Sequence, residues 1–195
     1  EAFSYPSFNL LMAGYFVCGC QVVFIGVHMP SYLKDNGLSP QVASYALALI
    51  GLFNVFGTYI AGTLGQRMPR RFILSFIYLA RAVAISIFLL VPLSPLSVYI
   101  FSAVMGTLWL STVPPTNATI AQIFGVQHLS MLGGFVFFSH QLGSFMGVWL
   151  GGYLYDATGS YDIVWYIAIG LGVLAGLVNL PIKEAPIQRA QPQAA

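Results

Sequence analysis

The chain has 195 residues, of which 58% are hydrophobic and only 6% are charged, and its formal net charge is +2. A soluble domain would carry about a quarter charged residues. The composition therefore excludes an ordinary water-soluble protein, and the sparse basic residues do not form a nucleic-acid-binding patch. It predicts an integral membrane protein.

Six continuous apolar segments follow one another along the chain. A helix needs about 20 residues to cross a hydrocarbon core about 30 Å thick. The segments cover residues 8–29, 41–65, 72–91, 96–124, 129–153 and 161–180. Unbroken apolar runs favour helices over the alternating pattern of a membrane barrel. We therefore expect an all-α integral membrane fold, with a bundle of six transmembrane helices over residues 1–184.

The first segment contains two cysteines and one amide side chain. Cys18 and Cys20 point about 200° apart on a helix, so they cannot easily share a disulfide or a metal. The sequence accordingly predicts no metal site and no cofactor. Gln21 lies near mid-depth, where it could contact a ligand or tie two helices together.

The second segment carries Asn54 near mid-depth, with the same two interpretations, and ends at a basic loop. If every segment crosses, five basic residues share one side of the membrane: Arg67, Arg70, Arg71, Lys183 and Arg189. The other side has only Lys34, beside Asp35. The positive-inside rule then predicts that the loop and both termini are cytoplasmic.

The third segment places Arg81 near the bilayer centre, which costs on the order of 3 kcal/mol. No acidic residue lies at the same depth. Its partner could be backbone carbonyls, an Asn or Gln side chain, water, another protein segment or an anionic substrate. We include Arg81 among the candidate substrate-binding residues.

The fourth segment contains Pro114-Pro115 inside an apolar run. Proline removes a backbone donor and kinks a helix, and kinked helices often line transport cavities. Asn117 lies beside this kink among several hydroxyl side chains, so it is a further candidate for contact with a solute.

The fifth segment contains His140 and Gln141 at its centre. Histidine can change charge near neutral pH, so His140 could bind a carboxylate, relay a proton or bond to a neighbouring helix. Gly143, Gly147 and Gly151 follow at a spacing of four, which lets two helices approach closely in lipid. This stripe predicts either a static contact or a sliding interface.

The chain ends are atypical of a complete membrane protein. Glu1 is not an initiator Met and no basic signal segment follows it, so we expect a piece of a longer protein or a processed product. Residues 185–195 are rich in Pro, Gln and Ala, and we expect a disordered cytoplasmic tail.

Enzyme motifs are absent from the sequence. It has no zinc-protease, nucleophile-elbow or phosphate-loop pattern, and its spans contain no carboxylate apart from Asp162 at the border of the last one. Ser144 lies four residues after His140, which leaves an intramembrane hydrolase as a weak alternative. We expect a protein that is not an enzyme.

Two loops resemble the major facilitator superfamily of transporters. Residues 62–71, Gly-Thr-Leu-Gly-Gln-Arg-Met-Pro-Arg-Arg, resemble its cytoplasmic loop motif, and residues 151–161 look like the external loop between its last two helices. The resemblance implies half of a twelve-helix fold, spans seven to twelve. It assigns a gating or loop role to four residues: Gly62, Arg67, Arg70 and Arg71.

The segments at residues 49–54 and 137–143 are similar to bacterial transporters of the monocarboxylate and oxalate–formate type. This sequence departs from them at Gln66, where the superfamily motif has Asp. It also has Asn54 and Thr58 where monocarboxylate transporters carry an Asp and an Arg, so that pair is not carried over. The resemblance makes spans seven, eight, ten and eleven line the cavity, which favours Gln21, Asn54, Asn117, His140 and Gln141.

These observations predict a secondary active transporter in a bacterial inner membrane. It would move a small organic solute, such as an organic anion, by alternating access with an N-terminal six-helix half. The alternative is a structural or assembly subunit of a larger membrane complex. The expected partners are the lipid bilayer, the solute and the second half, and no nucleic acid.

Overall fold

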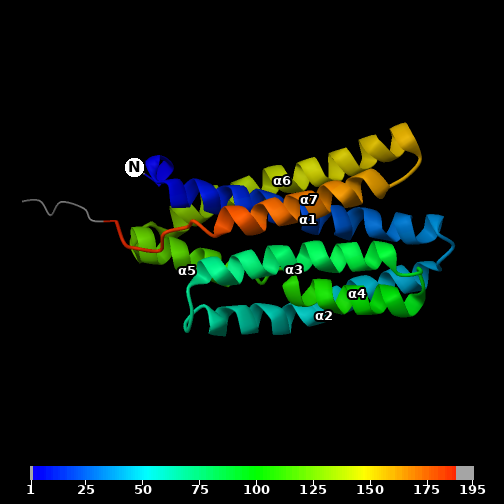
Figure 1. The fold of residues 1–195 in the computed structure, drawn as a ribbon, viewed down its shortest axis with the longest axis horizontal. Coiled ribbons are helices and arrows are strands. Elements are labelled where there is room, and N and C mark those ends of the chain that lie inside the picture. Colours follow the sequence, from blue (N-terminus) through cyan, green and yellow to red (C-terminus); the bar gives the residue numbers. More distant parts are fainter. Residues whose placement is uncertain (1, 188–195) are drawn as a thin grey trace, which may run out of the picture.

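A computed structural model describes residues 2–187 of the chain, and helices dominate this range. All of the long helices run along one axis (Figure 1). Two short 3₁₀ helices, η1 (Ala2–Ser4) and η2 (Val126–His128), accompany them. The α-helices are α1 (Pro6–Asp35), α2 (Pro40–Leu64), α3 (Arg70–Leu90), α4 (Pro95–Leu108), α5 (Val113–Phe124), α6 (Leu129–Thr158) and α7 (Asp162–Asn179).

Six spans are built from these seven helices. The expected fourth span is divided, because α4 ends at Leu108 and α5 begins at Val113. Within the described residues, five stretches are long and apolar enough to cross a membrane, and the stretch from α4 to α5 is one of them. α6 does not meet that measure although it has 30 residues, because Ser139, His140 and Gln141 lower the hydropathy of its centre.

The connections alternate between the two ends of the bundle. The α1–α2, α3–α4 and α6–α7 links lie at one end, and the α2–α3 link lies at the other, where the chain also enters and leaves (Figure 1). An even number of crossings produces this arrangement. The basic loop that follows α2 is therefore at the same end as residues 181–187.

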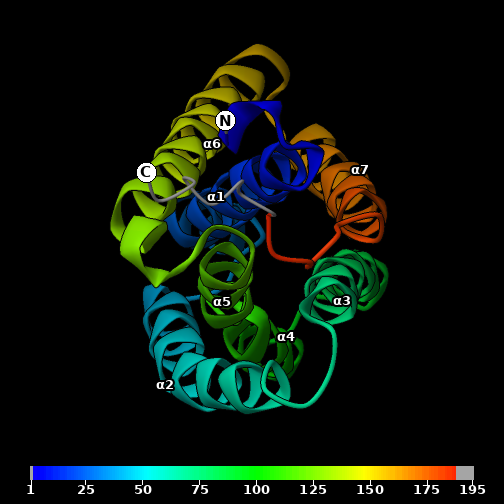
Figure 2. The same cartoon turned by 90° about the vertical axis from the view of Figure 1, so that its left-hand side faces the viewer.

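The bundle is assembled from three main helix pairs: α1 with α6, α2 with α4, and α3 with α7. Figure 2 shows α1 between α6 and α7, α4 between α2 and α3, and α3 beside α7 on one flank. A twofold axis relating the first three spans to the last three would exchange the α1–α6 pair with the α2–α4 pair. It would map the α3–α7 pair onto itself. Inverted three-helix repeats of this kind are frequent in secondary transporters.

The glycine stripe of α6 packs against α1. A Cβ atom at Gly143 would collide with the Phe16 carbonyl oxygen, and one at Gly147 would collide with the carbonyl of Cys20. Gly151 lies against the ring of His28. Gly134 of the same helix has open space around it. The stripe is therefore a close backbone contact, as its spacing predicts.

Among the described residues, four apolar clusters form the core, and two of them are large. In one, Trp165 packs edge-on against Phe24, and Phe88 stacks on Phe101 with ring centroids 4.1 Å apart. The other gathers Phe8 and residues of α5 and α6 toward the opposite end. The buried polar side chains Gln21 and Arg81 belong to neither cluster.

The outer surface of the bundle is also apolar. Large hydrophobic side chains are exposed along its helices, among them Phe76 at 67% and Phe145 at 64%. Such a surface is stable against lipid and not against water. The chain is thus a multi-pass membrane protein. The predicted disorder of the tail falls mostly on residues 188–195, which lie outside the described residues.

Candidate functional site

A hollow of about 490 Å³ opens between α1, α5 and α6. Most of its walls are apolar or glycine. Its lining residues are Tyr15, Leu110, Val113, Asn117, Leu129, Ser130, Gly133, Gly134, Val136, Phe137 and His140. A concave, mostly apolar site with a few polar groups is typical of small-molecule binding.

His140 is the most buried polar side chain of this lining, at 8% exposure. Its ring stacks on Phe137, with centroids 5.8 Å apart, and lies 5.2 Å from the ring of Tyr15. Its Nδ1 atom lies 3.3 Å from the Ser144 hydroxyl and 3.4 Å from Oε1 of Gln141. The histidine is therefore oriented by its own helix and by two aromatic rings.

The Ser144 hydroxyl donates a hydrogen bond to the His140 carbonyl oxygen at 2.9 Å. This is the ordinary bond of a serine to the preceding helical turn. It gives no support to the hydrolase alternative, which needs a serine whose proton passes to the imidazole.

Asn117 projects from α5 into the hollow and is exposed. A Cβ atom on Gly133 would lie 3.8 Å from Oδ1 of Asn117, so the amide faces α6 across the hollow. Gln141 is exposed on α6 beside His140 but does not line the hollow. The structure thus brings two of the candidates predicted from the sequence, Asn117 and His140, to one cavity.

Asn54 lies behind the hollow and not in it. Its Oδ1 atom accepts a hydrogen bond from the backbone N–H of Leu110 at 3.0 Å and from the Thr58 hydroxyl at 3.3 Å. Leu110 itself lines the hollow. Asn54 therefore contacts the wall through the backbone.

Gln21 and Arg81 are both fully buried and do not line the hollow. Gln21 donates to the Ala168 carbonyl oxygen at 2.8 Å, which ties α1 to α7. Arg81 donates to the carbonyl oxygens of Leu108 and Trp109 at 2.6 and 2.5 Å. Backbone carbonyls and Gln21 thus satisfy the arginine, two of the partners that the sequence left open.

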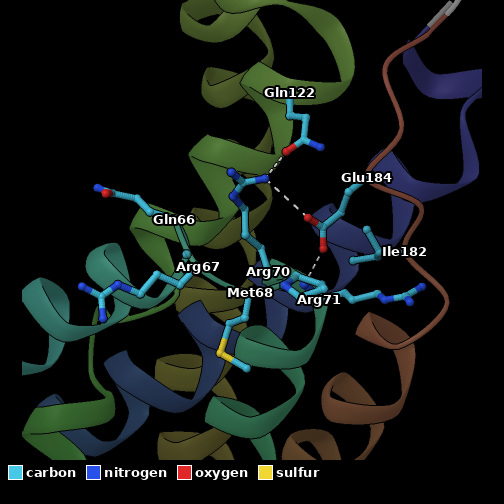
Figure 3. A pocket seen from close by; sticks show the side chains of 10 residues that line it. Gln66, Arg67, Met68, Arg70, Arg71, Gln122, Ile182 and Glu184 are labelled. Carbon is cyan, nitrogen blue, oxygen red and sulfur yellow. Dashed lines mark hydrogen bonds and ion pairs between the residues drawn. The ribbon is translucent and has the colours of Figure 1, made fainter.

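The loop motif lines a second hollow of about 490 Å³ at the end of the bundle where α2 connects to α3 (Figure 3). Arg70 donates to Gln122 of α5 and lies 3.4 Å from the carboxylate of Glu184. The other carboxylate oxygen of Glu184 accepts the backbone N–H of Arg71 at 2.9 Å. Glu184 therefore joins the segment after α7 to the first turn of α3.

The remaining loop residues have simpler surroundings. Arg67 is exposed, and the guanidinium of Arg71 lies 4.8 Å from the centroid of the Phe72 ring. Gly62 lies against α5, because a Cβ atom there would be 3.6 Å from Cβ of Pro114.

Sequence reasoning missed Tyr15 in the hollow and Glu184 in the loop. Nothing in a run of apolar residues marks which aromatic ring turns toward a cavity. Glu184 could have been found from two observations. It is an acidic residue on the same predicted side as the basic loop, and that loop has Gln66 in place of the carboxylate of the superfamily motif.

Comparison with known proteins matches residues 11–195 to the Major Facilitator Superfamily. An uncharacterized MFS-type transporter of Bacillus subtilis, YcxA, is 28% identical over 178 residues, which cover 88% of this chain and 43% of that protein. Monocarboxylate transporter 12-B of Danio rerio is 27% identical over 84% of this chain and 35% of its own length. Monocarboxylate transporter 13 of Rattus norvegicus is 26% identical over 89% and 40%.

The chain spans less than half the length of each of these relatives. The family match covers nearly all of the chain and agrees with its all-helical membrane fold. The relatives are named as transporters and not as enzymes. The chain belongs to the Major Facilitator Superfamily of membrane transporters.

Proposed function

We propose that the hollow between α1, α5 and α6 is one wall of a solute-binding cavity in a secondary active transporter. The observation that carries this proposal is the placement of His140 and Asn117, which face a mostly apolar hollow from two helices. Polar groups at membrane depth that face a cavity typically mark a solute pathway.

The solute that we propose is a small organic anion, such as a monocarboxylate. Two polar side chains on apolar walls suit a carboxylate with a short apolar body. A histidine can donate to the carboxylate and can also gain or lose a proton during coupling. Relatives named as monocarboxylate transporters support this class.

A second six-helix half is part of the proposal. The hollow is open, and the relatives are more than twice as long as the aligned region. We propose that this half rocks against an N-terminal half by alternating access. The basic loop and both chain ends would lie in the cytoplasm of a bacterium, beneath its inner membrane.

The test is uptake into liposomes that contain the full transporter. Radiolabelled L-lactate and pyruvate would be compared with a neutral solute of similar size, glycerol. His140→Ala should lower carboxylate uptake by about tenfold or more, as expected for the loss of a hydrogen bond to a charged ligand. The matched control is Phe138→Ala on the same helix, whose side chain is 59% exposed on the outer surface.

Uptake by His140→Ala within about twofold of the unaltered protein, a difference too small for a lost charged hydrogen bond, would refute the site assignment. Folded yield would be checked by gel filtration for each variant. If no carboxylate is taken up and the protein always co-purifies with a fixed partner, the assembly alternative gains instead.

A further inference from the structure

The fourth span is interrupted at residues 109–112, between α4 and α5. Pro114 and Pro115 occupy the first turn of α5 and have no N–H groups. The carbonyl groups one turn earlier therefore lose their helical donors. The backbone adapts with tighter bonds, from Trp109 N–H to the Gly106 carbonyl and from Val113 N–H to the Leu110 carbonyl.

Arg81 of α3 holds one side of this interruption. Its Nη2 atom donates to the carbonyl oxygens of Leu108 and Trp109, and its Nε atom also donates to Leu108 at 3.2 Å. These carbonyls form the C-terminal end of α4, which carries the negative end of the helix dipole. The partial negative charge at this end of the helix therefore stabilises the guanidinium of Arg81 without a carboxylate.

Asn54 of α2 holds the other side. It accepts the backbone N–H of Leu110, the next residue along the interruption. Two neighbouring helices thus satisfy consecutive backbone groups, with a donor for the carbonyls and an acceptor for the N–H. Unpaired backbone groups at this depth would each cost several kcal/mol.

Two side chains of α1 also contact the guanidinium of Arg81. Nη1 of Arg81 lies 3.4 Å from Sγ of Cys18 and 3.5 Å from Oε1 of Gln21. Cys18 also contacts the hydroxyl of Thr112, 3.4 Å away, at the end of the interruption. Among the residues that the structure describes, no acidic side chain forms an ion pair with Arg81.

We propose that Arg81 is a positioning residue for transport. Together with Asn54 it fixes the interrupted backbone and so sets the place of the α5 wall, where Leu110, Val113 and Asn117 line the hollow. The inference rests on the proposed solute-binding role of that hollow. It gives Arg81 an indirect role, because its side chain is fully buried and does not line the hollow.

The test measures the position of the wall without any solute. A reporter cysteine, Asn117→Cys, is labelled with a small methanethiosulfonate in the full transporter in liposomes. The native cysteines Cys18 and Cys20 are buried, and the protein without the reporter gives the background. In Arg81→Met the labelling rate should change by roughly tenfold, the factor that loss of a charged hydrogen bond gives in an equilibrium.

Arg81→Lys should restore the labelling rate in part, because it keeps the charge and can still reach one or two carbonyls. A control reporter, Ser130→Cys, lies on the α6 wall of the same hollow. Its labelling rate should stay within about twofold in Arg81→Met, as expected for a site that does not share these bonds.

If Arg81→Met does not yield folded protein, Asn54→Ala serves instead, because it removes the bond to Leu110 and otherwise only the bond from the Thr58 hydroxyl within α2. An unchanged rate at Asn117→Cys in a folded variant would overturn the proposal. Equal changes at both reporters would also overturn it, since they indicate general loosening. The labelling needs no solute, so a failed uptake assay would refute the proposed function and leave this inference to be judged separately.

Discussion

Glu184 offers the sharpest test of how the loop motif works in this chain. Its carboxylate accepts the N–H of Arg71 at 2.9 Å and lies 3.4 Å from the guanidinium of Arg70, which in turn bonds to Gln122 (Figure 3). One side chain therefore connects the end of the chain to α3 and, through Arg70, to α5. Glu184→Ala removes both links.

The expected loss follows from three contributions. A hydrogen bond to a charged group contributes about 1.5–3 kcal/mol, and the Arg71 N–H bond is of this kind. A carboxylate near the N-terminus of a helix adds about 0.3–1 kcal/mol. The ion pair with Arg70 is 14–20% exposed and adds about 0–1 kcal/mol. Together these contributions lead us to expect that Glu184→Ala lowers the free energy of unfolding by about 2–5 kcal/mol.

The assay is thermal unfolding of the detergent-purified protein. For 150–250 residues, about 1 kcal/mol corresponds to 2–4 °C in Tm, so Glu184→Ala should lower Tm by about 4–20 °C. Glu184→Gln keeps an acceptor for the Arg71 N–H and loses only the charge. Its Tm should therefore lie between that of the unaltered protein and that of Glu184→Ala. Asp156→Asn, at an exposed acidic residue of α6, is the matched control.

A Tm for Glu184→Ala that equals that of Asp156→Asn would refute this account of the loop. It would mean that the Arg70 contact is an exposed pair of little energetic weight. A Tm for Glu184→Gln as low as that of Glu184→Ala would show that the charge, and not the hydrogen bond to α3, accounts for the stability.

Two further predictions concern helix packing. Gly143→Ala should destabilise the protein by about 1–3 kcal/mol, because the new methyl group collides with an α1 carbonyl oxygen. The control is Gly134→Ala on the same helix, where the methyl group has free space. A similar Tm for the two variants would contradict the close contact. Tyr78→Phe should cost about 1–2 kcal/mol, because the buried Tyr78 hydroxyl donates to the Gly14 carbonyl at 2.6 Å. Tyr166→Phe is its control, at 65% exposure, and equal denaturation midpoints would count against this bond.

The fold was largely predictable from the sequence because its strongest determinants are local. Continuous apolar runs and the turn residues between them give the spans, and the even number of spans gives the common side of the basic loop and the two chain ends. The spacing of Gly143 and Gly147 likewise predicted a helix contact. It could not name α1 as the partner, since that depends on how distant segments assemble.

The division of the fourth span shows where sequence reasoning stops. Pro114-Pro115 predicted a kink, but the interruption begins five residues earlier, at Trp109. There Arg81 and Asn54, from two other helices, bond to backbone groups of Leu108 and Leu110. No pattern within the segment contains that information.

The candidate site was predicted by residue type and depth alone, and this criterion cannot distinguish a polar group that binds a solute from one that supports the helices. In the structure the bonds of Arg81 and Gln21 go to backbone carbonyls and to each other. Asn117 and His140 instead face the hollow. If the hollow binds a solute as proposed, changes at these two facing residues should alter transport, while the supporting groups, which are paired within the protein, keep the bundle folded. In that case few substitutions suffice to change the substrate, and similarity to monocarboxylate transporters identifies the family but not the solute.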